Sequence, residues 1–202
     1  MFITLEGVDG AGKSTQARLL AEALGPETVL LREPGGTPVG ERLRDLLKDG
    51  SIELTPRAEL LLFCAARAEL VERVIRPALD AGRDVVCDRF TDSTVAYQGG
   101  ARGMDAAVVG ALNEVAIAGT APDRTVYLRL DPARALERAG GRVGAAGSED
   151  RFEREGVGFQ AEIAAAFERI AEADPERFVA VDAEGSVEEV HGRVLAALGV
   201  ER

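Results

Sequence analysis

The sequence predicts an α/β fold in which a five-stranded parallel sheet is covered by helices on both faces. Five short apolar runs alternate with segments of helical periodicity, and alternation of this kind is typical of buried parallel strands joined by helical crossovers. Polar and glycine-rich residues follow several of the runs, where open α/β sheets place their ligands. No repeat, long linker or low-complexity segment divides the chain, so we expect a single domain over residues 1–202.

Each expected element has a local signal. We expect strands over residues 2–6, 29–31, 84–89, 125–130 and 178–182. We expect helices over residues 14–24, 39–47, 56–79, 104–118, 132–138, 150–173 and 187–198, with a helical turn within 90–103. Thr55 and Pro56 are typical of an N-cap followed by proline at the first helical position, and Gly82 lies just beyond that helix. Pro77 is expected to kink or shorten it.

The first strand leads into the pattern G-x-x-x-x-G-K-[ST], which Gly7, Gly12, Lys13 and Ser14 complete. Glycines let successive N–H groups and the start of the following helix converge on one anion. Lysine then faces the outer phosphates, and the Ser14 hydroxyl is placed to ligate magnesium. We therefore expect a nucleoside triphosphate, ATP, to bind Gly7, Val8, Asp9, Gly10, Ala11, Gly12, Lys13, Ser14 and Thr15. A chance glycine-rich turn would not explain the strand before the pattern and the helix after it.

Composition excludes several classes of function. The net charge of −11 and pI of about 4.7 repel polyanions, so we expect no nucleic acid polymer as a partner. Cys64 and Cys87 have no C-x-x-C spacing and are typical of buried thiols in a reducing compartment. Without an apolar run of membrane length or a signal segment, we expect a cytoplasmic protein that contacts no membrane. The single histidine, His191, cannot supply a histidine-centred triad or zinc site and is expected on a helix face.

Two pairs of residues suggest a second binding site beside the phosphate loop. Phe63 and Arg67 are four residues apart on a predicted helix, so a ring and a guanidinium share one face. The alternative, a core phenylalanine and a solvated arginine, stays open at this point. Asp88 and Arg89 end the third strand, where they could direct magnesium through water and hold a phosphate. Ser93, Thr94, Tyr97 and Gln98 then lie close together on one side of a helical turn and could contact a base or sugar.

These segments together resemble bacterial thymidylate kinases. The resemblance rests on residues 6–15, 32–37, 88–90, 93–99 and 150–153, with Phe63 and Arg67 between them. It covers nearly the whole chain in order. It implies a P-loop NTPase sheet of order 2-3-1-4-5 with a short lid, and transfer of the γ-phosphoryl group of ATP to dTMP, giving dTDP and ADP for dTTP biosynthesis. It also implies Mg²⁺ and a homodimer.

The resemblance assigns roles to individual residues. It implies that dTMP is bound by Asp9, Glu33, Pro34, Phe63, Arg67, Arg89, Ser93, Thr94, Tyr97 and Gln98. Phe63 would stack on thymine, Arg67 would bond its edge, and Tyr97 would clash with a ribose 2′-hydroxyl. Ser14 and, through water, Asp88 would hold the metal. Lys13, Asp9 and Arg89 would act in catalysis, and Arg44 would add charge near the acceptor phosphate.

Thymidylate kinases carry a further catalytic arginine either in the phosphate loop or in the lid, so the resemblance implies that one of these two segments supplies it here. The variable positions of the phosphate loop, Val8 to Ala11, carry nothing basic. Glycines after Arg138 are too frequent for regular structure, so we expect a mobile lid over about residues 139–152, although a plain loop is the alternative. Arg142 falls where related bacterial lids carry the reaching arginine, and Arg138 and Arg151 are the other candidates. Related lids are often richer in arginine than this one.

Three rival classes were compared with this hypothesis. A regulatory GTPase needs an N-K-x-D motif, and the one asparagine, Asn113, lies in Leu-Asn-Glu-Val, which excludes that class. Another nucleotide or nucleoside kinase would differ at Phe63, Arg67 and Tyr97. A non-catalytic nucleotide-binding module would keep Lys13 without needing the acceptor-side residues.

Overall fold

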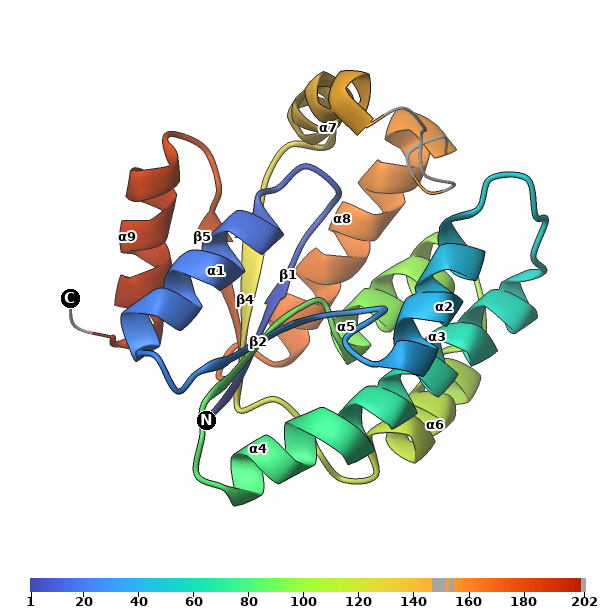
Figure 1. Cartoon of the computed structure of the whole chain (residues 1–202). Helices are drawn as coiled ribbons and strands as arrows, with labels where there is room; N and C mark the ends of the chain where they lie inside the picture. The colour runs from blue at the N-terminus through green and yellow to red at the C-terminus, as the bar shows by residue number, and fades with distance from the viewer. Residues whose placement is uncertain (147–151, 153–154, 201–202) are drawn as a thin grey trace.

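The computed structural model describes residues 1–146, 152 and 155–200, and its centre is a five-stranded parallel sheet (Figure 1). The strands are β1 (Phe2–Glu6), β2 (Val29–Arg32), β3 (Val85–Asp88), β4 (Arg124–Arg129) and β5 (Phe178–Asp182). Their order is β2-β3-β1-β4-β5, and every neighbouring pair is parallel. The predicted fold class and the implied strand order are therefore confirmed.

Helices cover both faces of the sheet. They are α1 (Lys13–Leu24), α2 (Pro38–Lys48), α3 (Pro56–Leu70), α4 (Arg76–Asp80), α5 (Thr91–Thr94), α6 (Ala106–Ile117), α7 (Pro132–Ala146), α8 (Gly156–Ala173) and α9 (Val187–Leu198), with π-helical turns at Val71–Ile75 and Val95–Ala101. Helices α1 and α9 pack together on one face, whereas α8 covers β4 and β5 from the other (Figure 1). Helices α2, α3 and α6 form a further group beside the sheet, at the end where β2 lies.

The parallel register brings the ends of three strands together. Leu5 pairs with Asp88, and Arg32 also pairs with Asp88 from the other side. The segments that follow these strands therefore start at the same edge of the sheet. They are the phosphate loop after β1, Glu33 after β2 and Arg89 after β3. This is the edge at which open α/β sheets bind ligands.

Local signals fix several helix starts. The Thr37 side chain accepts a bond from Gly40 N–H at the start of α2, and the Thr55 side chain accepts one from Ala58 N–H at the start of α3. Both helices have proline in the first helical positions, whose missing N–H is not needed there. The N-cap predicted at Thr55 is confirmed.

The apolar faces of these elements form the core. The largest cluster joins β1, α1, β4, α8 and α9 and includes Leu5, Leu20 and Phe167, each with no exposed surface. A second cluster packs Phe2 against Phe90 on the other side of β3. The helices are amphipathic rather than uniformly apolar, and none in the described part of the chain has the length and hydropathy needed to cross a bilayer.

The segment from residue 56 to 80 is helical throughout, as predicted, but it contains a π-helical turn at Val71–Ile75. Pro77 follows within two residues. Its ring has no N–H to donate and collides with the carbonyl four residues earlier in a regular helix. A widened turn just before the proline relieves this conflict.

Two predictions near the lid were wrong for the described residues. Helix α7 continues to Ala146 instead of ending near Arg138. Each interior glycine costs about 1 kcal/mol relative to alanine, but a helix already nucleated can absorb that cost, and two alanines close it. Helix α8 begins at Gly156, not near residue 150. Gly156 has a φ of +79°, which interrupts a right-handed helix and sets its start. Residues 147–151 and 153–154 lie outside the described part.

Candidate active site

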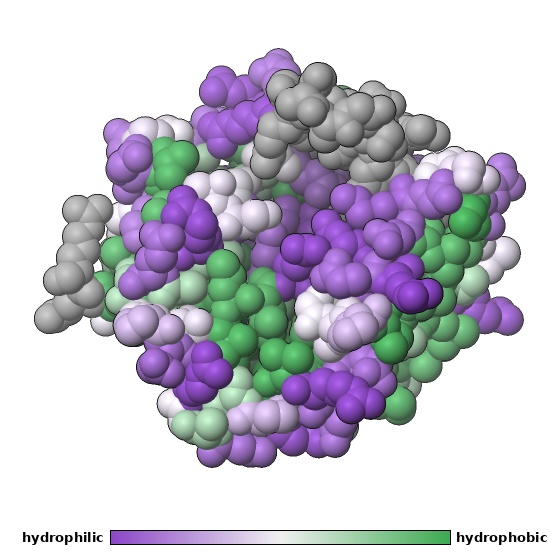
Figure 2. Space-filling model, viewed as in Figure 1, coloured by the Kyte–Doolittle hydropathy of each residue, from purple (hydrophilic) through white to green (hydrophobic). Residues whose placement is uncertain are grey.

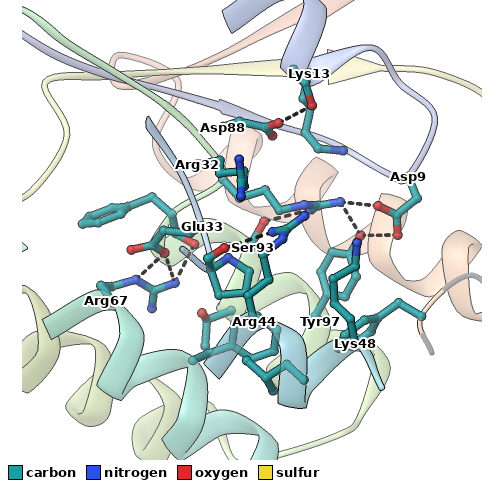
Figure 3. Close-up of a pocket in the computed structure, with 18 of the residues that line it drawn as sticks. Asp9, Lys13, Arg32, Glu33, Arg44, Lys48, Arg67, Asp88, Ser93 and Tyr97 are labelled. Carbon is teal, nitrogen blue, oxygen red and sulfur yellow. Dashed lines mark hydrogen bonds and ion pairs between the residues drawn. The ribbon is translucent and has the colours of Figure 1, made fainter. Parts of the chain in front are cut away.

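A cavity of about 340 Å³ opens at the carboxyl edge of the sheet, between the phosphate loop and helices α2 and α3 (Figure 3). Figure 2 shows hydrophilic residues gathered around this hollow. The side chains around it come from every segment that the sequence singled out; they include Asp9, Lys13, Glu33, Phe63, Arg67, Asp88, Arg89, Ser93, Thr94, Tyr97 and Gln98. The structure thus brings the predicted acceptor residues to one place.

Lys13 lies folded back over its own loop. Its ammonium group donates to the carbonyls of Gly7 and Val8, at 3.0 and 2.8 Å. Burial, together with the charge of Arg89, lowers the pKa of Lys13 to about 8, although Asp9 opposes the shift. A bound polyanion would therefore both attract this group and restore its charge.

The loop is crowded at Gly10. This residue has a φ of +90°, and a Cβ atom built on it would lie 1.9 Å from the carbonyl oxygen of Ala135 in α7. Glycine is required on both counts. The start of α7 is thus packed directly on the phosphate loop.

The Ser14 hydroxyl and the Asp88 carboxylate lie side by side. Ser14 Oγ donates to Asp88 Oδ2 at 2.5 Å, at the end of the cavity next to Lys13 (Figure 3). Hydroxyl and carboxylate oxygens are the ligands that Mg²⁺ prefers, and magnesium beside nucleotides usually takes only one or two protein ligands. The donor set present fits that ion.

Arg89 is the centre of a hydrogen-bonded group of side chains in this cavity. Its guanidinium donates to Asp9 at 2.5 Å, to the Tyr97 hydroxyl at 2.9 Å and to Ser93 Oγ at 3.0 Å. Its backbone is held at a φ of +72°, which is unusual for a non-glycine residue. Figure 3 shows Asp9, Ser93 and Tyr97 turned toward one position. A fork of donors fixed in this way is suited to a phosphate.

The charges in this group stabilise one another. Burial alone would raise the pKa of Asp9, but the charges of Arg89 and Lys13 lower it to about 2. Burial also raises the pKa of Tyr97 well above its ordinary value, so its hydroxyl stays protonated. It donates to Asp9 Oδ2 at 3.0 Å. Asp9 is therefore an anion at neutral pH, held by donors that include Arg89 and Tyr97.

Phe63 and Arg67 both line the cavity, and the alternative of a core phenylalanine with a solvated arginine is wrong. The Phe63 ring is half-buried at the cavity wall, 6.0 Å from the ring of Phe152, rather than in the core. Arg67 is 1% exposed rather than solvated. It donates to Glu33 at 2.9 Å, to Asn113 at 2.7 Å and to the Phe90 carbonyl at 3.0 Å. The guanidinium is thus fixed before any ligand arrives.

Glu33 has one unusual oxygen. One carboxylate oxygen pairs with Arg67, whereas Oε1 is the one buried side-chain N or O atom in the described residues without a hydrogen-bond partner. Burial raises the pKa of Glu33, although the charge of Arg67 lowers it. A buried acceptor of this kind is costly unless a ligand or water donates to it.

A second cavity, of about 310 Å³, lies on the other side of the phosphate loop. Gly10 and Gly12 line both cavities. The remaining wall of the second is made by Ala11, Thr15, Gln16, Arg138, Ala183, Gly185, Ser186, Val187 and Val190. Arg138 donates to the Ala183 carbonyl at 3.1 Å and to Glu184 at 3.2 Å, which joins α7 to the segment after β5.

Comparison with known proteins decides between the remaining classes. The family model described as thymidylate kinase matches residues 5–194. The chain belongs to the thymidylate kinase family. A thymidylate kinase from Solidesulfovibrio magneticus is 50% identical over 98% of this chain and 99% of its own length. One from Pelodictyon phaeoclathratiforme is 46% identical over 98% of this chain and 95% of its own. The crystal structure of the Ehrlichia chaffeensis thymidylate kinase has a TM-score of 0.79 at 35% identity, covering 98% of both chains.

Two buried residues that had no predicted role, Glu6 and Gln160, form hydrogen bonds that hold cavity-lining residues of this thymidylate kinase family member in place. Glu6, fully buried, accepts bonds from Phe90 N–H at 2.8 Å, from Ser93 N–H at 3.2 Å and from the Ser93 hydroxyl at 2.5 Å. It therefore holds the turn that carries Arg89. Burial and the nearby Asp92 raise its pKa to about 7, although the charge of Arg89 and the hydrogen bonds oppose the shift.

Gln160, in α8, is the other supporting residue. Its amide oxygen accepts from Asp9 N–H, and its amide nitrogen donates to Asp9 Oδ2, both at 3.3 Å. Nothing in the local sequence of α8 marks this glutamine, because its partner lies 151 positions away. Phe152, which lines the cavity beside Phe63 and Tyr97, lies in the segment 150–153 that carries the resemblance but was given no role.

The three arginines predicted to reach the phosphates from a lid differ in what the structure describes. Arg138 is described and lines the second cavity. The backbone of Arg142 lies within α7, but its side chain is outside the described part of the structure. Arg151 lies outside it entirely. The choice of Arg142 as the reaching arginine therefore stays a prediction.

Proposed function

We propose that this chain transfers the γ-phosphoryl group of ATP to dTMP, giving ADP and dTDP. The observation that carries the proposal is the position of the phosphate loop, whose Gly10 and Gly12 line two cavities. Phosphates bound from either side meet at this loop. The membership of the thymidylate kinase family supports the identity of both nucleotides.

On the donor side, ATP lies with its phosphates along Gly7 to Thr15 and its nucleoside toward the second cavity. The loop glycines and the start of α1 direct N–H groups at the phosphates. Lys13 exchanges its two carbonyl partners for phosphate oxygens. Ser14, and Asp88 through water, would hold Mg²⁺, which would neutralise charge between the phosphates.

On the acceptor side, Arg89 holds the phosphate of dTMP. A phosphate oxygen attacks the γ-phosphorus of ATP, and the bond from that phosphorus to the oxygen bridging it to the β-phosphorus breaks, so the charge leaves on ADP. The acceptor is already an anion, and no proton has to be removed before attack. The work of Arg89 and Lys13 is to hold two polyanions in line. Asp9 lies near the sugar 3′-hydroxyl, and Tyr97 blocks a 2′-hydroxyl.

The base is held by the inner wall of the cavity. Phe63 stacks on thymine, and Arg67, fixed by Glu33 and Asn113, faces its edge. Pro34, Ser93, Thr94 and Gln98 complete the pocket. Because Arg67 cannot swing away, the pocket is formed before dTMP binds, which lowers the entropic cost of binding.

We further propose that Arg142 reaches the transferring phosphates from a lid over residues 139–152. By analogy with arginine fingers, Arg142→Ala should lower kcat on the order of a thousandfold while affinity for both nucleotides changes little. Arg138→Ala and Arg151→Ala are the matched controls. If either of them removes turnover and Arg142→Ala does not, the assignment to Arg142 is wrong.

We also propose a single domain that forms a homodimer through α3 and α6. These adjacent helices expose Leu61, Val108 and Val115 to 47, 48 and 77%. An apolar helix face left in water is typical of an interface. Light scattering should give twice the chain mass, and Val115→Glu should reduce it to one chain. A wild-type protein that stays monomeric at micromolar concentration contradicts this.

The cytoplasm is the compartment we propose. Cys64 and Cys87 are buried and unpaired, as expected where thiols stay reduced, and ATP is supplied there. Fractionation of cells should recover the protein with the soluble contents.

A coupled assay of ADP release tests the function directly. With dTMP present, ADP should form far faster than with AMP, CMP or no acceptor. An AMP-specific enzyme would point to another nucleoside monophosphate kinase. An acceptor-independent or absent turnover would point to a hydrolase or to a non-catalytic module.

A further inference from the structure

Gln98 and Glu59 form a buried pair behind the base-binding wall. Gln98 lies in the π-helical turn Val95–Ala101, and Glu59 lies in the first turn of α3. Each is 1% exposed, and Gln98 Nε2 donates to Glu59 Oε1 at 2.8 Å. Gln98 lines the cavity, whereas Glu59 is not among the residues lining it.

The chemistry of this pair fixes which way the amide points. A carboxylate can only accept hydrogen bonds, so the –NH₂ group of Gln98 must face Glu59. The amide oxygen of Gln98 accepts no bond from any described residue. It is also not among their fully buried unpartnered atoms, of which Glu33 Oε1 is the single case. The oxygen is therefore accessible from the cavity, which Gln98 lines.

We propose that Glu59 is a positioning residue that sets base specificity by locking Gln98 with its oxygen toward the pocket. This inference rests on the proposed function. An oxygen at that position pairs with the N3–H donor shared by thymine and uracil. It opposes the N3 lone pair of cytosine, and leaving two acceptors face to face is costly. Discrimination against cytosine would therefore begin at a residue that never touches the base.

A purely structural role for Glu59 explains the contacts less well. One further neighbour of the Glu59 carboxylate, Arg102, lies 3.4 Å away, whereas Arg102 pairs with Glu155 at 2.6 Å and lies 4.7 Å from the centre of the Phe159 ring. Arg102 thus has stronger partners elsewhere. A buried carboxylate is also costly to keep, and a neutral residue of the same shape would serve packing equally well. The charge of Glu59 is best explained by the short hydrogen bond that its carboxylate accepts from Gln98.

Glu59→Gln tests the proposal because the variant keeps the shape of the side chain but can donate as well as accept. The Gln98 amide is then free to turn. The measurement is kcat/KM for dTMP, dUMP and dCMP. We expect the dTMP to dCMP ratio to fall about tenfold or more. The dTMP to dUMP ratio should stay within about twofold, since both bases carry N3–H. If the first ratio is unchanged, or if both ratios fall together, the proposal is overturned.

Two further variants make the test independent of folding. Glu155→Gln weakens the other contact of Arg102 and leaves the Glu59–Gln98 pair intact, so both ratios should match the wild type; a fall in the dTMP to dCMP ratio overturns the proposal.

The exchange Glu59→Gln with Gln98→Glu keeps one acid in the pair and still presents an oxygen to the pocket. It should restore preference for dTMP over dCMP, and failure to do so in a folded protein counts against the proposal. If the wild-type enzyme does not phosphorylate dTMP, the proposed function itself fails, before any variant is measured.

Discussion

The two cavities that share the phosphate loop are similar in size and opposite in character. The first, of about 340 Å³, is lined by nine charged residues, whereas Arg138 is the one charged residue among the described residues that line the second, of about 310 Å³. The first holds its side chains in place by bonds such as Arg67 to Glu33 and Arg89 to Asp9. Most residues that line the second cavity are glycine, alanine or valine. Recognition by side chains is thus concentrated on the acceptor side.

This difference has a physical reason. The donor contributes a triphosphate, which backbone N–H groups of a glycine loop can hold without charged side chains apart from Lys13. The acceptor contributes one phosphate and a base that must be told from similar bases. That requires fixed donors and acceptors, and fixing them requires buried partners. Substitutions in the two cavities should therefore have unequal effects.

Arg89→Ala should produce the largest difference between the two sides. Loss of two charge-assisted bonds, at about 2 kcal/mol each, predicts a fall of about a thousandfold in kcat/KM for dTMP. Steady-state kinetics and ATP binding measured by calorimetry check this. Arg89→Lys, which keeps the charge without the fork, should recover part of the activity. An equal loss of ATP affinity in Arg89→Ala would show that the residue serves both cavities.

Glu6→Gln should show that the acceptor side is maintained at a cost to stability. The folded pKa of Glu6, about 7, exceeds its ordinary value of 4.5, so the folded state holds a proton that the unfolded chain releases between these pH values. The contribution of Glu6 to stability is therefore full below pH 4.5 and is lost as the pH rises to 7, by on the order of 3 kcal/mol. Urea unfolding of both proteins at pH 4.5 and 7 measures it. The difference between them should change by that amount, and a constant difference would contradict the prediction.

Phe63→Ala should raise KM for dTMP by about tenfold to a hundredfold, because stacking of a base on an aromatic ring is worth about 1–3 kcal/mol. KM for ATP should not change. Val187→Ala, in the wall of the second cavity, is the matched control and should alter KM for ATP less than about threefold. Unchanged affinity for dTMP in Phe63→Ala would refute the stacking role.

The smallest expected effect concerns a proton on the donor side. The pKa of Lys13 is lowered to about 8 in the free protein, and phosphates should raise it. ATP binding at pH 8.5 should therefore take up about three quarters of a proton. Calorimetric titrations in buffers of different ionisation heat measure the uptake. Lys13→Met should abolish it, and a heat independent of buffer in the wild type would contradict this account.

Most of the fold and the outline of the site followed from local sequence. The strand order matched that of the resemblance, and the phosphate loop, Thr55 and the acid and base after β3 are all marked by neighbours within a few positions. Such features can be predicted from the sequence because they depend on local backbone conformation and helix capping. The lengths of α7 and α8 did not follow, since a helix can absorb glycines that look like breaks.

The supporting residues could not be found in this way. Glu6 meets Ser93 across 87 positions, Gln160 meets Asp9 across 151, and Glu59 meets Gln98 across 39. Their roles come from the folded arrangement, and a lone glutamate or glutamine on a predicted helix is usually solvated. Arg67 is similar: its spacing from Phe63 predicted a shared face, but only the fold shows that Glu33 and Asn113 immobilise it.

The carbonyl of Ala135 above Gly10 limits how positive charge can reach the reaction. No side chain fits at that point of the loop, so an arginine placed there would push α7 away from the sheet. With α7 in this position, the loop cannot supply an arginine at residue 10, which agrees with the proposal that the arginine comes from the lid. Because the start of α7 rests on Gly10, the packing of Ala135 on the loop fixes the point from which the proposed lid extends.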